Sequence, residues 1–151
     1  MHKLSSSKTG PLLGTITVPG DKSISHRALI MGALAVGESK ISGLLEGEDV
    51  LGTASALRAL GADIYKDDNT VWHVHGVGIG GLREPEISLN MGNSGTGVRL
   101  LMGLVATHPI QVTFTGDSSL SSRPINSRSD FMPVMANASV PLLIKKASSP
   151  S

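Results

Sequence analysis

Apolar side chains recur at the spacing of an α-helix in three segments of the chain. Residues 24–36 carry them at positions i, i+4, i+7 and i+11, which form one helix face: Ile24, Ala28, Met31 and Ala35. Gly37 ends this predicted helix. A second helix is expected from Asp49, a residue type favoured at the N-cap, to Gly61, and its apolar side is made of Val50, Ala54, Leu57 and Leu60. Residues 98–107 predict the third helix.

Short runs of alternating and β-branched residues separate the helices and predict strands. They comprise residues 12–20, which close with Pro19-Gly20, and then residues 40–45, 62–66, 70–77 and 110–116. The turn-rich tripeptide Asp67-Asp68-Asn69 joins two of these runs into a strand pair. Because helices and strands alternate, we expect an α/β fold. Its core must be aliphatic, since 40% of the residues are hydrophobic and only 3% are aromatic.

Two of the predicted helices are similar in sequence. Residues 28–35 (ALIMGALA) align without gaps with residues 99–106 (RLLMGLVA) at an offset of 71. When the alignment is continued backwards, Lys22-Ser23 lies opposite Asn93-Ser94. This favours a repeated loop–helix–strand unit in which the helix N-termini occupy similar positions.

Charge and composition exclude several classes of protein. The 151 residues are enough for one domain or for part of a larger one, and a net charge of +1 offers no basic field for nucleic acid. Because the chain has no cysteine, a disulfide framework, a zinc–thiolate site and a cysteine nucleophile are excluded. No segment has the length of a signal-peptide core or a membrane span, so we expect a cytoplasmic protein without nucleic-acid or membrane partners.

Cationic side chains gather at the start of the first predicted helix, within VPGDKSISHRALI (residues 18–30). Unpaired N–H groups and the macrodipole make a helix start a place where phosphate or carboxylate can bind. Lys22 would add a point charge from the loop, and Arg27, on the same face as Ser23, a bidentate guanidinium. The alternative is that Asp21 or Ser23 caps the helix while both cations point to solvent.

Two further polar stretches could contribute to such a site. In GNSGTGVR (residues 92–99) the glycines permit positive φ and close backbone approach, and Ser94 and Thr96 offer hydroxyls. The spacing fits neither a Walker A loop nor a dinucleotide-binding loop, and a plain strand-to-helix turn has the same composition. In the predicted polar loop GDSSLSSRP (residues 116–124) the proline restricts the backbone around Arg123, whose guanidinium is then either aimed at a ligand or solvated.

The histidines carry less information. His73 and His75 alternate along a predicted strand and therefore share a face, but no third ligand accompanies them, so no metal site is expected. His26, beside Arg27, is expected to pack rather than to donate to an anion.

Taken together, VPGDKSISHRALI, GNSGTG and TGDSSLSSRP resemble, in their order and approximate spacing, the 5-enolpyruvylshikimate-3-phosphate (EPSP) synthases of the enolpyruvyl transferase family. The resemblance covers roughly residues 12–126. It implies an inside-out, barrel-like α/β domain built from repeated helix–strand units, here incomplete. It also implies transfer of the enolpyruvyl group from phosphoenolpyruvate to the 5-hydroxyl of shikimate 3-phosphate, with release of phosphate, on the route to chorismate and the aromatic amino acids.

The resemblance assigns roles to particular residues. Shikimate 3-phosphate would be bound by Lys22, Ser23 and Arg27. Phosphoenolpyruvate would be bound by Lys22, Asn93, Gly95 and Arg123. Lys22 would also be the catalytic residue that moves the proton. No metal or organic cofactor is implied, the complete enzyme is expected to be a monomer, and glycine at position 95 implies sensitivity to the inhibitor glyphosate.

Two alternatives remain open. Enolpyruvyl transferases that act on UDP-N-acetylglucosamine carry Lys-Asn where this chain has Lys22-Ser23, and they rely on a cysteine that this chain lacks. The family is much longer than 151 residues, and after Ile125 its expected sequence gives way to a Ser-rich end, so the chain is alternatively a non-catalytic remnant or a weak anion-binding module. A truncated or frame-disturbed product, inactive by itself, is the simplest expectation.

This interpretation divides the chain into three parts. Residues 1–20 are a strand segment of the family's first domain. Residues 21–126 are a partial enolpyruvyl transferase domain, and residues 127–151 are a divergent tail.

Overall fold

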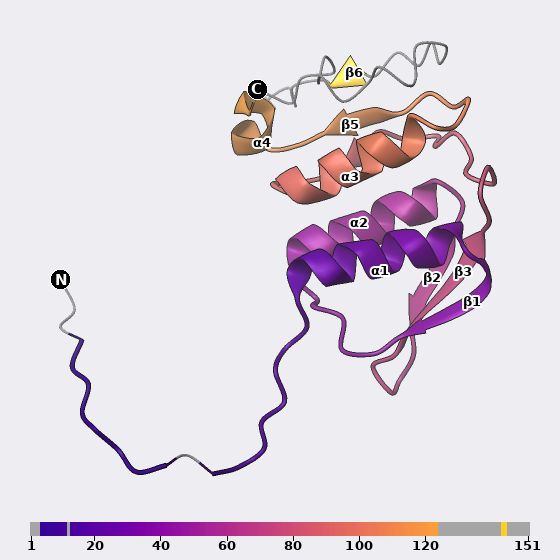
Figure 1. Ribbon diagram of the computed structural model, residues 1–151. Helices are drawn as coiled ribbons and strands as arrows, with labels where there is room; N and C mark the ends of the chain where they lie inside the picture. Colours follow the sequence, from indigo (N-terminus) through magenta and orange to yellow (C-terminus); the bar gives the residue numbers. More distant parts are fainter. Residues whose placement is uncertain (1–3, 12, 124–142, 145–151) are drawn as a thin grey trace.

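A computed structural model describes residues 4–11, 13–123 and 143–144 (Figure 1). The elements follow one another as α1 (Lys22–Leu34), β1 (Val36–Ile41), α2 (Glu48–Ala59), β2 (Asp63–Lys66), β3 (Trp72–Val77), β4 (Leu89–Asn90), α3 (Gly95–Val105), β5 (Thr113–Thr115), α4 (Ser118–Ser122) and β6 (Leu143–Ile144). No helix in these ranges is long and apolar enough to cross a membrane.

The helices α1, α2 and α3 lie side by side between two small sheets, so the helices are inside and the sheets outside (Figure 1). The first sheet has the order β1-β3-β2 and is antiparallel, and it covers α1 and α2. The second has the order β4-β5-β6 and is parallel. This layering confirms the inside-out α/β arrangement that the sequence implies.

The strand pair β2–β3 and its turn confirm the sequence prediction. Asp63 of β2 lies opposite His75 of β3, and Lys66 opposite Trp72. In the turn, the Asp67 carboxylate accepts hydrogen bonds from backbone N–H groups two and four residues further on, at 2.9 and 2.8 Å. The side chain of Asp67 therefore holds the reversal together with two backbone hydrogen bonds, from the Asp67 N–H to the Val71 carbonyl at 2.9 Å and from the Thr70 N–H to the Asp67 carbonyl at 3.1 Å.

The core is aliphatic, as the composition predicts. Its largest fully buried apolar side chains are Leu29, Leu57, Leu60, Leu101 and Phe114. They come from the three inner helices, from the C-cap of α2 and from β5, so one continuous core links the two sheets. The single tryptophan, Trp72, is 5% exposed and donates its Nε1–H to the Glu46 carboxylate at 3.2 Å.

Helix and strand boundaries differ from the predicted ones by a few residues. The first helix begins at Lys22 rather than at residue 24, because Asp21 is its N-cap. The second begins at Glu48, with Gly47 at the N-cap, so the predicted capping by Asp49 is wrong. The third begins at Gly95, because Ser94 caps it within the glycine-rich loop. The strand expected at residues 40–45 instead forms at Val36–Ile41, as β1.

The strand expected at residues 12–20 is not formed among the described residues 13–20. This segment runs away from the domain without joining a sheet (Figure 1). Leu13, Ile16 and Val18 are 95%, 85% and 73% exposed. Alternation of side chains fits a strand, but a strand forms only where a neighbour completes its hydrogen bonds, and the described part of the chain offers this segment none.

Candidate active site

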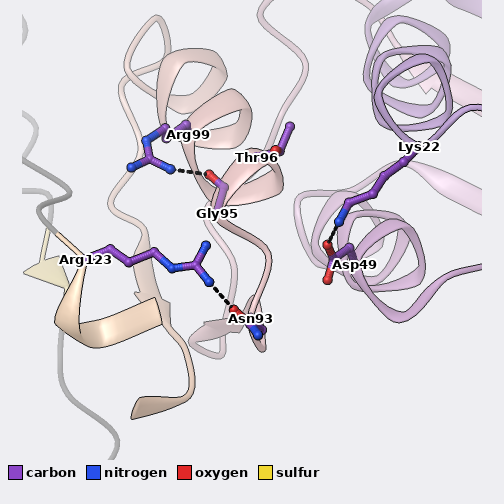
Figure 2. Close-up of a pocket in the computed structure, with 7 residues that line it drawn as sticks. All are labelled: Lys22, Asp49, Asn93, Gly95, Thr96, Arg99 and Arg123. Carbon is purple, nitrogen blue, oxygen red and sulfur yellow. Dashed lines mark hydrogen bonds and ion pairs between the residues drawn. The ribbon is translucent and has the colours of Figure 1, made fainter. Parts of the chain in front are cut away.

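The starts of three helices meet at one cavity of about 280 Å³ (Figure 2). Lys22 is the first residue of α1, Asp49 the second residue of α2, and Gly95 the first residue of α3. The full lining is Lys22, Asp49, Asn93, Gly95, Thr96, Arg99 and Arg123. Helix starts carry partial positive charge and this lining adds three cations to one carboxylate, so the cavity is suited to anions.

Lys22 is held at the cavity by the cap of α1 and by an ion pair. The Asp21 carboxylate accepts the backbone N–H of Ile24 at 2.7 Å, which fixes the first turn. The Lys22 ammonium pairs with the Asp49 carboxylate of α2, and their side chains are 50% and 24% exposed. An ion pair so open to water contributes about 0–1 kcal/mol, so Lys22 can exchange Asp49 for an anionic ligand at little cost.

A buried serine fixes how α1 meets the segment that leads into α2. The Ser25 hydroxyl donates to the Asp21 carbonyl at 2.7 Å and accepts the backbone N–H of Leu45 at 3.0 Å. Ser25 is 4% exposed, so both bonds are shielded from water. Ser25 of DKSISHR therefore has a structural role, because it holds α1 against the segment that leads into α2.

The opposite side of the cavity is built by the glycine-rich loop and α3. The Ser94 hydroxyl accepts the Gly97 N–H at 3.1 Å, and Arg99 folds back to donate to the Gly95 carbonyl at 3.0 Å. A methyl group on Gly95 would lie 2.6 Å from a guanidinium nitrogen of Arg123 and 3.1 Å from one of Arg99. Glycine at this position is what allows both guanidinium groups to stand over the start of α3.

Arg123 is positioned by a short helix where the sequence predicts a loop. Residues 118–122 form α4, because the Asp117 carboxylate caps it by accepting the Leu120 N–H at 2.7 Å. Arg123 follows the helix and donates to the Asn93 side-chain oxygen at 2.5 Å and to the Ser119 hydroxyl at 3.3 Å. These bonds aim the guanidinium into the cavity (Figure 2).

The cavity brings together the four residues that the family resemblance assigns to phosphoenolpyruvate: Lys22, Asn93, Gly95 and Arg123. Ser23 and Arg27 are exposed and do not line it. They share one face of α1 as predicted, and Arg27 donates to the Ser23 carbonyl at 3.0 Å. Their assignment to shikimate 3-phosphate stays a prediction.

Sequence reasoning misses two lining residues, Asp49 and Arg99, and names a third, Thr96, only as a hydroxyl in the glycine-rich loop. Arg99 was visible as the arginine that ends GNSGTGVR, and its i to i+4 relation to Gly95 would place it over the loop. Asp49 was assigned to an N-cap, although a carboxylate in the first turn is equally typical.

Comparison with known proteins decides the family. The family model described as EPSP synthase (3-phosphoshikimate 1-carboxyvinyltransferase) matches residues 6–141. The chain belongs to the EPSP synthase family. The resemblance inferred from three short motifs is thereby confirmed.

Individual relatives agree with this assignment. The 3-phosphoshikimate 1-carboxyvinyltransferase of Novosphingobium aromaticivorans is 68% identical over 116 residues, which cover 77% of this chain and 26% of the relative. The enzyme of the same name from a Bradyrhizobium species is 54% identical, covering 97% of this chain and 35% of the relative. A solved EPSP synthase from Acinetobacter baumannii has a TM-score of 0.69 at 49% identity, covering 74% of this chain and 25% of that structure. The chain thus spans about a quarter to a third of the length of these EPSP synthases.

His26 packs inside this EPSP synthase domain, as predicted. It is fully buried, and its Nδ1 lies 2.9 Å from the Thr53 hydroxyl of α2. Burial is the main cause that lowers the pKa of His26, and the nearby cations Lys22 and Arg27 act in the same direction, against Asp49. The ring is therefore neutral at physiological pH.

His73 and His75 form a polar cluster on the outer face of the first sheet. Among the described residues, no group of three potential ligands is arranged to hold a metal ion. His73 instead lies between two carboxylates, with Nδ1 2.6 Å from Glu38 and Nε2 3.2 Å from Asp67. Tyr65 stacks on its ring at a centroid distance of 4.9 Å. The hydrogen bond to Glu38, followed by the one to Asp67, raises the pKa of His73.

This cluster predicts a dependence of stability on pH. The stabilisation from His73 is complete below the ordinary histidine pKa of 6.5 and is lost as the pH rises through its raised folded-state pKa. The hydrogen bond from His73 is the main cause that lowers the pKa of Glu38, and the hydrogen bond from the Val71 N–H is the main cause that lowers the pKa of Asp67. The stabilisation from these two carboxylates is therefore lost only as the pH falls through their lowered pKa values. The free energy of unfolding of the wild type, measured by urea unfolding followed by Trp72 fluorescence, should therefore decline above pH 6.5.

The variant His73→Gln isolates this effect from other titrating groups. His26 acts in the opposite sense, because its lowered pKa makes protonation of the unfolded chain destabilising as the pH falls below 6.5. Because His26 is present in both proteins, its contribution cancels when the free energy of unfolding of His73→Gln is subtracted from that of the wild type. The interpretation of the cluster is contradicted if this difference is the same at pH 6 and pH 9.

Proposed function

We propose that this chain supplies one wall of the active site of an EPSP synthase. The reaction transfers the enolpyruvyl group of phosphoenolpyruvate to the 5-hydroxyl of shikimate 3-phosphate and releases phosphate. The observation that carries the proposal is the convergence of Lys22, Arg99 and Arg123 on one cavity at three helix starts. Two anionic substrates repel each other, and several converging cations are what allow them to bind together.

Phosphoenolpyruvate would bind at the side of the cavity formed by α3 and α4. Arg123 offers a planar guanidinium that suits carboxylate or phosphate, and Asn93 holds it in place. Gly95 leaves space beneath this guanidinium that a side chain would fill. Lys22 faces them from α1 (Figure 2).

Shikimate 3-phosphate would bind at the start of α1. Lys22, Ser23 and Arg27 occupy the first two turns of that helix, where the dipole favours a phosphate group. Lys22 belongs to both substrate sites, so it lies where the two reactants meet. We assign it the transfer of the proton to the enol carbon, and Asp49, its present partner, would exchange places with substrate oxygens.

Calorimetry on the 151-residue chain tests this proposal. Shikimate 3-phosphate should bind, phosphoenolpyruvate should bind, and both affinities should fall with added salt because the contacts are ionic. UDP-N-acetylglucosamine should not bind. We expect no release of phosphate when both substrates are present, because the chain spans only about a quarter to a third of the length of the EPSP synthases it matches.

The possible outcomes separate two parts of the proposal. A folded chain that binds neither substrate contradicts the assignment of the cavity. Phosphate release would show that the 151-residue chain is active without further catalytic groups. The proposal also includes a cytoplasmic location and a monomeric complete enzyme.

A further inference from the structure

A buried polar pair lies one helical turn beneath the ion pair at the cavity. His26 follows Lys22 by four residues on α1, and Thr53 follows Asp49 by four residues on α2. Residues four apart lie on the same helix face. The two pairs therefore join the same two helices at successive turns, one at the surface and one inside, where His26 and Thr53 are both fully buried.

The pair also reaches the third helix of the site. A methyl group on Gly97, in the first turn of α3, would lie 3.0 Å from the Thr53 hydroxyl and 2.6 Å from the Ser94 hydroxyl that caps α3. Thr53 thus sits against the backbone of α3 while it contacts α1 through His26. All three helices whose starts line the cavity meet at this one hydroxyl.

The hydrogen positions follow from the partners available. The Thr53 hydroxyl can donate to the Asp49 carbonyl of the preceding turn at 3.3 Å, which leaves its oxygen free to accept from His26. The Nε2 atom of His26 is buried without a partner. A buried acceptor is left unpaired more often than a buried N–H donor, so the proton belongs on Nδ1 and Nε2 keeps a lone pair.

We propose that His26 and Thr53 are a positioning pair that keeps α1 and α2 in register while Lys22 exchanges Asp49 for an anionic substrate. The proposal rests on the function proposed above. When Lys22 turns to a substrate, the surface link between the two helices is broken. The pair beneath carries no charge and is shielded from solvent and ligand, so the same event leaves it intact and the helix starts keep their places.

Two substitutions at position 53 separate a positioning role from simple packing. Thr53→Val keeps the shape of the side chain but cannot accept the proton of His26, whereas Thr53→Ser keeps the hydroxyl. We expect the affinity for shikimate 3-phosphate, measured by calorimetry, to fall about fivefold in Thr53→Val and to be retained in Thr53→Ser. Imidazole ¹⁵N spectra should show the His26 proton on Nδ1 in the wild type and in Thr53→Ser.

A control variant accounts for general loss of stability. Val74→Ala opens a cavity in the first sheet, against Gly32 in the second half of α1 and away from the helix starts. It should unfold at lower urea concentration yet bind like the wild type. The proposal is overturned if Thr53→Val binds like the wild type, if Val74→Ala loses as much affinity, or if the proton is on Nε2.

Failure of the function proposed above gives a result that differs from failure of the positioning role alone. In that case the wild type itself, folded by Trp72 fluorescence, does not bind shikimate 3-phosphate, and the positioning role falls with it. If the wild type binds and only the expected difference between Thr53→Val and Thr53→Ser is missing, the function stands and the positioning role alone is refuted.

Discussion

Replacing Lys22 with alanine should reduce the affinity of the chain for shikimate 3-phosphate and for phosphoenolpyruvate by about 100-fold. Lys22 is assigned to both substrates, and hydrogen bonds to charged groups are worth about 1.5–3 kcal/mol each. Its removal also leaves the Asp49 carboxylate without its partner at the cavity, where it repels an incoming anion. Calorimetry with each substrate separately measures the loss.

Lys40→Ala is the matched control for this substitution. Lys40 is also a half-exposed lysine beside a carboxylate, with its ammonium 3.7 Å from Glu38, but it lies on the outer face of the first sheet. It removes the same charge from the chain without touching the cavity. Equal losses in both variants would mean that net charge, and not the position of Lys22, governs binding.

Gly76→Ala should lower the free energy of unfolding by about 3 kcal/mol. A methyl group at this position of β3 would overlap the carbonyl oxygens of Gly32 and Ala35 at the end of α1. Those atoms belong to the backbone and cannot rotate aside, so the helix and the strand must separate. Urea unfolding followed by Trp72 fluorescence gives the free energy of unfolding.

Gly52→Ala provides the comparison. Gly52 lies within α2, and no heavy atom is within 4 Å of the place where its Cβ would stand. Alanine is favoured over glycine in a helix by about 1 kcal/mol, so this variant should be more stable than the wild type. If both glycine variants change stability alike, close packing at Gly76 is not the reason for its glycine.

Local patterns predicted those elements whose partners are close along the chain. The pair β2–β3 followed from two alternating runs and the turn at Asp67, because the hairpin contains its own hydrogen-bond partners. The three inner helices followed from their apolar faces. The segment at residues 12–20 failed for the opposite reason: its alternation is real, but pairing depends on a neighbour that no local pattern reveals.

The candidate site was predicted in its chemistry better than in its geometry. The family resemblance that three motifs carry names Lys22, Asn93, Gly95 and Arg123, and these residues line one cavity. Asp49 was placed at a cap because residue type locates a helix start only to within a turn, while its ion pair with Lys22 depends on how two helices pack. Contacts between residues far apart in the sequence require the fold.

Opposite ends of α1 have separate tasks. Its first turn presents Lys22 to the cavity, whereas its C-cap residue Ala35 accepts at its carbonyl the N–H of Gly78, which directly follows β3, at 3.1 Å. Thirteen residues place these ends about 18 Å apart. Substitutions that refine ligand recognition and substitutions that strengthen the scaffold thus fall on different turns, so evolution or an engineer can adjust either property without sacrificing the other.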